Sequence, residues 1–173
     1  KNIFLIYGIN EGIKDEIISS FTLEYPKEAI FRYDEKEIFL NLENFYNNLY
    51  SQSFFEEKKI ILIDDITDKF KNEVELILSK KLIDVTLILI SNNLEKKSKI
   101  RSLFEKDKEL ICVPVYKDDN RNLFNIANTF FKSKNIKISP ESINLIIERS
   151  SEDRKNLKNE LNKIESFVGD KKK

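Results

Sequence analysis

The sequence predicts an α/β domain with a mostly parallel five-stranded sheet, followed by a small domain of three helices. Short apolar runs alternate with helical patterns over residues 1–116, and this alternation is typical of crossover units in a parallel sheet. From residue 117 onward only helical patterns occur. The predicted domains are therefore 1–116 and 117–173.

Five apolar runs predict the strands of the sheet. A short continuous run of this kind fits a strand that is buried on both faces. The runs cover residues 3–7, 29–31, 59–63, 85–90 and 110–113. Pro114 follows the last run, and we expect it to end that strand because proline cannot donate a ladder hydrogen bond.

Apolar residues at helical spacing predict the helices. One face of a single helix is marked by Ile38, Leu42, Phe45 and Leu49. In the second domain, Ser139 and Pro140 form a cap followed by a first-turn proline. Further on, Ser150 with Asp153 resembles a capping box.

Composition excludes several classes of function. The charges balance, with 30 Lys+Arg against 30 Asp+Glu, which gives no support for strong non-specific binding to nucleic acid, although a local basic patch stays open. One cysteine excludes an internal disulfide and fits a reducing compartment, and the lack of histidine excludes a Ser-His or Cys-His pair. No apolar run approaches the roughly 20 residues of a membrane span. Because the chain begins without Met, we expect a fragment of a longer protein.

The loop after the first strand departs from a phosphate-binding loop. A working loop reads G-x-x-x-x-G-K-[ST], and its backbone N–H groups and lysine bind the phosphates. Here residues 8–15 read GINEGIKD. The glycine spacing is one residue short, Lys14 does not follow a glycine, and Glu11 and Asp15 add negative charge where a triphosphate would sit. We predict no cofactor and no catalytic residue.

Asp64 and Asp65 follow the third strand, where an active enzyme of this class holds magnesium. Acidic residues after a strand also occur in ordinary solvated loops. Because a phosphate loop is missing, we interpret this pair as part of a solvated loop and predict no metal site.

The order of elements resembles the RecA-like AAA+ fold with its helical lid, and more specifically the delta subunit of the bacterial DNA polymerase III clamp loader. Four stretches carry the resemblance, which extends over the whole chain: FLIYG, SFF with the following KKIILI, LILISN and KNELNKI. Arg154 loosely resembles the second sensing position of active lids. With no nucleotide to sense, we interpret it as a solvated or salt-bridged arginine.

The resemblance implies a role in DNA replication. Delta subunits are not enzymes by themselves and work within the cytoplasmic DNA polymerase III holoenzyme. They bind the ring-shaped sliding clamp, the beta subunit, and hold it open at one interface. The implied partners are this clamp and, in the full-length protein, other clamp-loader subunits, with DNA contacted indirectly. Since the collar domain of the family is missing from the sequence, we expect the fragment to be monomeric.

The same resemblance places the clamp contact on Ser53, Phe54 and Phe55. Two adjacent aromatic side chains can fill an apolar groove on a partner. The alternative is that Phe54 and Phe55 pack in the chain's own core, although neighbouring positions of a helix cannot face one side together. Residues that could push on the clamp are Asn47, Asn48 and Tyr50.

Two other functions stay open. The first is an ATP-hydrolysing AAA+ protein with an aberrant phosphate loop. The second is a nucleic-acid-binding module, because a basic cluster that could contact DNA is formed by Lys96, Lys97, Lys99 and Arg101.

Overall fold

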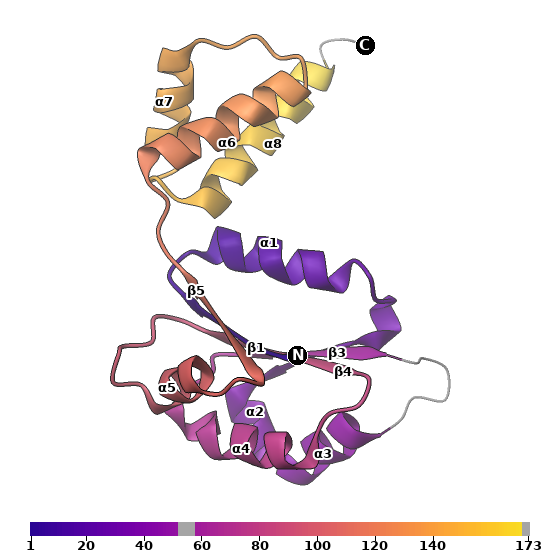
Figure 1. Cartoon of the computed structure of the whole chain (residues 1–173). Helices are drawn as coiled ribbons and strands as arrows, with labels where there is room; N and C mark the ends of the chain where they lie inside the picture. The colour runs from indigo at the N-terminus through magenta and orange to yellow at the C-terminus, as the bar shows by residue number, and fades with distance from the viewer. Residues whose placement is uncertain (52–57, 171–173) are drawn as a thin grey trace. The chain divides into compact units, whose positions relative to one another are not determined.

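The computed structural model describes residues 1–51 and 58–170 (Figure 1). The chain divides into two compact units. The first contains Lys1–Ile9 and Glu16–Val115, and the second contains Asn10–Asp15 and Tyr116–Lys173. A helix that begins at Glu11 therefore contributes residues to both units.

The first unit is built on a sheet in which every strand pair is parallel, so the predicted α/β architecture is confirmed. Its order is β2-β3-β4-β1-β5. The strands are β1 (Ile3–Gly8), β2 (Ile30–Asp34), β3 (Lys59–Asp64), β4 (Val85–Ser91) and β5 (Leu110–Val115). Because the strands are parallel, their carboxyl ends meet at one edge, where folds of this kind place their ligands.

Helices cover both faces of this sheet (Figure 1). One face carries α1 (Glu11–Thr22), where the ring of Phe21 meets the ring of Phe4 at a centroid distance of 4.8 Å. The other face carries α2 (Glu35–Leu40), α3 (Leu42–Tyr50), α4 (Lys71–Lys80) and α5 (Lys99–Lys106). Strand residues alternate between the faces, and a continuous core forms on the second face around Leu5, Ile63, Leu89, Phe45 and Phe70.

The single helix predicted from the face of residues 38–49 is wrong, because the structure has two helices there. Asn41 interrupts the helix with φ −150° and ψ 71°. Its side chain accepts a hydrogen bond from the Asn44 N–H at 3.0 Å, which caps a new helix. The apolar face continues across the break because Ile38 and Phe45 are buried in the same core.

The predicted end of the last strand at Pro114 is also wrong. β5 continues through Pro114 to Val115, and Pro114 pairs with Tyr7 of β1. β5 is an edge strand. A proline is tolerated there because no second neighbouring strand needs its missing N–H.

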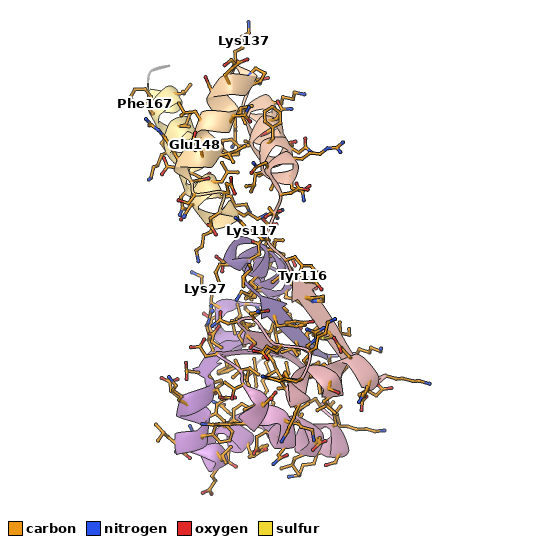
Figure 2. All side chains as sticks on the ribbon, turned by 90° about the vertical axis from the view of Figure 1, so that its left-hand side faces the viewer. Lys27, Tyr116, Lys117, Lys137, Glu148 and Phe167 are labelled. Carbon is orange, nitrogen blue, oxygen red and sulfur yellow. The ribbon has the colours of Figure 1, made fainter. Side chains whose placement is uncertain are left out.

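Besides the first turn of α1, the second unit contains three helices, as predicted: α6 (Asn120–Ser133), α7 (Pro140–Arg149) and α8 (Arg154–Asp170). Their apolar faces enclose a separate core formed by Leu123, Ala127, Phe131, Ile143, Ile147, Leu157 and Leu161. Lys137 and Phe167 lie on the outside of this unit (Figure 2). Within residues 1–51 and 58–170, no helix combines the length and the apolar character of a bilayer span.

The capping box predicted at Ser150 and Asp153 is wrong, because the two residues serve different helices. The Ser150 hydroxyl donates to the Ile147 carbonyl at 2.7 Å, at the end of α7. The Asp153 carboxylate accepts from the Asn156 N–H at 2.8 Å, at the start of α8. Positive φ at the two residues between Ser150 and Asp153 turns the chain from one helix to the next. The cap at Ser139 with a first-turn proline is confirmed.

Candidate functional site

Gly8 fixes the direction in which the chain leaves β1. Its φ is 137°, a value that L side chains rarely adopt. A Cβ at this position would lie 1.9 Å from the carbonyl oxygen of Val115. The Gly8 N–H donates to the Asn92 carbonyl at 3.1 Å, which joins the loop to the end of β4. Only glycine fits this close approach of two backbones.

Asn10 caps α1 from within the loop. Its Oδ1 accepts a hydrogen bond from the Ile13 N–H at 3.1 Å. Its Nδ2 donates to the Tyr116 carbonyl at 2.9 Å and to Asp118 Oδ2 at 2.8 Å. The free N–H groups at a helix start are the donors that a phosphate loop offers to its ligand. In this chain the buried side-chain amide of Asn10 accepts a hydrogen bond from one of these groups, the Ile13 N–H.

Asp118 and Arg154 form a bidentate ion pair in the second unit, beside this loop. Arg154 Nε lies 2.8 Å from Asp118 Oδ2, and Arg154 Nη2 lies 2.9 Å from Oδ1. Both side chains are largely buried: 15% of Arg154 and 4% of Asp118 is exposed. The methylenes of Arg154 cover Gly12 so closely that a Cβ on Gly12 would lie 2.7 Å from Arg154 Cγ. Of the two interpretations of Arg154, the structure contains the salt-bridged one.

Lys14 also forms an ion pair with a neighbouring side chain of α1. Its Nζ lies 2.6 Å from the Glu11 carboxylate, and the residue is only 2% exposed. A more exposed pair, Lys155 with Asp15 at 2.8 Å, continues the pairing at the surface. The cations nearest the helix start therefore bind carboxylates of the chain, and such charge-assisted contacts are the strong class of hydrogen bonds.

The acidic pair after β3 is divided between two environments. Asp64 accepts hydrogen bonds from Nε and Nη2 of Arg32 at 2.5 and 2.9 Å. Asp65 is exposed and adopts φ 54° in the following turn. Among the described residues, no group of three or more His, Cys, Asp or Glu side chains could hold a metal ion.

A second buried lysine lies at the junction of α3 and β3. Lys59 is 8% exposed, and burial lowers its pKa. Its Nζ donates to the carbonyl oxygens of Asn48 and Ser51, the latter at 2.7 Å. The last carbonyls of a helix lack intrahelical partners and carry partial negative charge. Lys59 thus caps the end of α3 and brings residues 51 and 59 together.

The predicted clamp-binding residues lie outside the described residues; they are Ser53, Phe54 and Phe55. The predicted pushing residues lie on the last turns of α3. Asn48 is partly engaged, since its Nδ2 donates to the Tyr33 hydroxyl at 2.6 Å. Asn47 is exposed, and Tyr50 is 37% exposed and stacks on Tyr46 at 6.0 Å. Asn47 and Tyr50 are therefore accessible to a partner.

The predicted basic cluster contains one residue bound within the chain and three exposed lysines. Arg101 turns inward, with Nε 2.8 Å from Glu105 and Nη1 donating to the Leu94 carbonyl at 3.1 Å. The lysines stay exposed. A depression of about 650 Å³ next to α5 is lined by the five lysines Lys71, Lys96, Lys97, Lys99 and Lys106, with Asp107, Ser102 and Leu103.

Sequence reasoning missed Asp118 and Lys59. Asp118 stands next to Asp119, which caps α6 through the Asn122 N–H at 2.7 Å, so an acidic doublet before a helix has an ordinary explanation. Lys59 begins a run of buried apolar residues. A lysine in the first buried position of a strand is the one signal that could have indicated an internal partner.

No protein-family model matches the chain, and no curated protein matches its sequence. Among solved structures it is similar to the Bacillus subtilis DNA clamp loader delta protein, with TM-score 0.67 and 12% identity over 98% of this chain and 54% of that one. It is also similar to the Thermotoga maritima RuvB Holliday junction branch migration motor, with TM-score 0.60 and 14% identity over 99% of this chain and 56% of that one. A third similar structure is the replication initiator DnaA bound to AMPPCP and single-stranded DNA, with TM-score 0.58 and 18% identity over 94% of this chain and 55% of that one.

These similarities show that the chain has the RecA-like AAA+ fold found in clamp-loader proteins, as the sequence predicts. At identities of 12–18% they show the fold alone. The chain spans little more than half the length of each of these three proteins.

Proposed function

We propose that the chain comprises the first two domains, 1–116 and 117–173, of a non-catalytic clamp-loader subunit of the delta type. It binds the DNA sliding clamp and helps to hold the ring open during DNA replication. Its full-length form works with other clamp-loader subunits in the DNA polymerase III holoenzyme of the cytoplasm. The fragment by itself is a monomer that meets DNA only through its partners.

One observation carries the non-catalytic part of this proposal. Lys14 and Arg154, the cations beside the start of α1, already bind the carboxylates of Glu11 and Asp118. A triphosphate would have to displace these carboxylates, and separating a buried ion pair such as Arg154–Asp118 costs several kcal/mol. The fold is therefore used as a scaffold and not as an ATPase.

Calorimetric titration with Mg-ATP separates this proposal from the alternative of an ATPase with an aberrant loop. We expect no binding heat at millimolar nucleotide. A dissociation constant in the micromolar range would overturn the non-catalytic assignment. It would leave the clamp contact to be decided by its own experiment.

The proposed clamp contact is formed by Ser53, Phe54 and Phe55. Each buried Phe side chain contributes about 1.5–3 kcal/mol from area alone. The double variant Phe54→Ala/Phe55→Ala is therefore expected to lose at least roughly 100-fold in affinity for the sliding clamp.

The matched control for that double variant is Phe167→Ala, which removes an aromatic ring that is 63% exposed on α8 (Figure 2). Surface plasmon resonance with the clamp of the same organism measures all three proteins. Wild-type affinity in Phe167→Ala together with loss in the double variant supports the site. Equal binding by all three proteins, or binding by none, overturns it.

The lysine-lined depression beside α5 favours a second candidate function, contact with a nucleic-acid backbone. The basic residues that line the depression differ from the predicted cluster. Arg101 is bound to Glu105, and Lys71 and Lys106 join Lys96, Lys97 and Lys99. Each phosphate contact adds about −0.9 to the slope of log K against log salt. We expect Lys96→Ala/Lys99→Ala/Lys106→Ala to flatten that slope for duplex DNA, measured without clamp; an unchanged slope would exclude this surface.

A further inference from the structure

Asp118 is the centre of a donor set that would suit a free oxyanion. Two of the donors are nitrogens of the Arg154 guanidinium, at 2.8 and 2.9 Å, and the third is Asn10 Nδ2 at 2.8 Å. A planar guanidinium fork with an amide at a helix start is a combination that proteins use for phosphates and carboxylates. Here the anion inside the set is a side chain of the chain itself.

The neighbouring residue shows that Asp118 is not required for an ordinary local purpose. The connection from β5 to α6 needs one cap, and Asp119 supplies it by accepting from the Asn122 N–H at 2.7 Å. Asp118 points elsewhere: its side chain is 4% exposed and bonds to residues far away in the sequence. Burying a carboxylate is costly unless it is paired. The contacts to Arg154 and Asn10 are therefore what keeps Asp118 buried.

We infer that Asp118 is a built-in anion that takes the place of a bound oxyanion beside the start of α1. The carboxylate holds Asn10 in the orientation that caps α1, and it holds Arg154 over Gly12. The loop is thereby kept in one conformation without any nucleotide. This inference rests on the closed loop of the proposed function, but a different variant decides it.

Removal of the carboxylate, with the donors kept, converts the set into a site for an external oxyanion. In Asp118→Ala, the guanidinium and amide groups that now bind Asp118 lose this acceptor and stay largely buried, which destabilises the fold. We expect the melting temperature to fall by roughly 5–15 °C in chloride buffer. Inorganic phosphate at millimolar concentration is expected to restore it in a saturable way, because only the folded state offers the donor set.

The experiment is a thermal melt of the full chain in sodium phosphate, compared with sodium chloride at equal ionic strength. The matched control is Asp68→Ala, which removes another carboxylate at a helix start, one whose donors are the Ile100 N–H and the Ser98 hydroxyl. We expect recovery by phosphate in Asp118→Ala and no specific recovery in Asp68→Ala or in the wild type.

Two results would overturn the inference: Asp118→Ala that is indifferent to phosphate, or equal recovery in the control. If Asp118→Ala does not fold in chloride, refolding in phosphate followed by circular dichroism gives the same answer, and failure in both buffers counts against the inference. Neither result bears on clamp binding by Phe54 and Phe55, so the inference and the proposed function fail separately.

Discussion

The chain buries one lysine at the start of a helix and another at the end of a helix, and stabilises them differently. Lys14 binds the carboxylate of Glu11, three residues away on α1. Lys59 binds backbone carbonyls of Asn48 and Ser51, at the end of α3. The carboxylate partner of Lys14 lies within one helical turn. The pairing of Lys59 joins a helix to a strand that follows it in the chain.

The two lysines mark two different regions. We call the start of α1 the closed region, because its cations pair with nearby side chains. The α3–β3 junction is a supporting region, because Lys59 connects two elements there. Around the start of α1, the cations and a helix N–H group pair with side chains of the second unit. At the α3–β3 junction, Lys59 binds Asn48 and Ser51, so it connects the last described residues before Phe54 and Phe55 to β3. Binding sites need such rigid support close to the residues that make contact.

The largest effect is expected from Gly8→Ala in the closed region. The new Cβ would lie 1.9 Å from the Val115 carbonyl oxygen, at a φ that alanine avoids. We expect the free energy of unfolding to fall by about 3–5 kcal/mol. Gly12→Ala is the comparison, since its Cβ would meet side-chain atoms of Arg154 instead of backbone, in a helical conformation that alanine favours, and a smaller loss is expected. Urea denaturation measures both, and an equal loss in the two variants would contradict the distinction between a backbone contact at Gly8 and a side-chain contact at Gly12.

The two lysines can be compared directly by replacing each with methionine. Lys59→Met leaves the carbonyls of Asn48 and Ser51 without the ammonium that binds them now, which is expected to cost about 1–3 kcal/mol. Lys14→Met releases the Glu11 carboxylate, whose side chain is 50% exposed and regains water, so a smaller loss than in Lys59→Met is expected. Chemical denaturation at pH 7 decides between them. The comparison is wrong if Lys14→Met is the more costly variant.

The same pair of variants tests whether Lys59 supports the proposed clamp contact. Lys59→Met is expected to weaken binding to the sliding clamp by roughly tenfold, because the segment loses its fixed base. Lys14→Met is expected to bind like the wild type, and Lys137→Met controls for the loss of one positive charge at an exposed position (Figure 2). Binding is measured by calorimetry below the melting temperature of each variant. Unchanged affinity in Lys59→Met would limit its role to stability.

The smallest effect concerns Asp68, which joins the start of α5 to the loop before α4. Burial raises the pKa of Asp68, but hydrogen bonds from Ile100, Ser98 and Lys99 outweigh it and lower the pKa from its ordinary value. A carboxyl with a lowered folded pKa stabilises the fold above its unfolded pKa and loses this contribution as the pH falls through the folded value. Asp68→Asn is therefore expected to show a shallower loss of stability below pH 4, measured by melts from pH 7 to 2. A slope equal to that of the wild type would contradict this role.

The sequence predicts the sheet well because strand residues that are buried on both faces leave continuous apolar runs. It predicts helix boundaries less well. The break at Asn41 depends on a side chain capping its own backbone, within an apolar pattern that continues unbroken. The strand through Pro114 depends on its place at the edge of the sheet, which no local pattern states.

For the candidate site, the sequence predicts only the departure of residues 8–15 from a phosphate-binding loop. The altered glycine spacing of residues 8–15 and the charges of Glu11 and Asp15 are visible in the sequence. The binding of Arg154 by Asp118 is not, because it joins residues 36 positions apart through the fold. Nor does any local pattern assign Asn10–Asp15 to the second unit.

That assignment has a consequence for the order of events during synthesis. Asn10–Asp15 leave the ribosome more than 100 residues before the residues that contact them, which belong to Tyr116–Lys173 and include Arg154. Contacts of such long sequence separation form late because the intervening chain must first be made and ordered. The first turn of α1 therefore reaches its native contacts only after Arg154 has been synthesised, later than the sheet residues on either side of it.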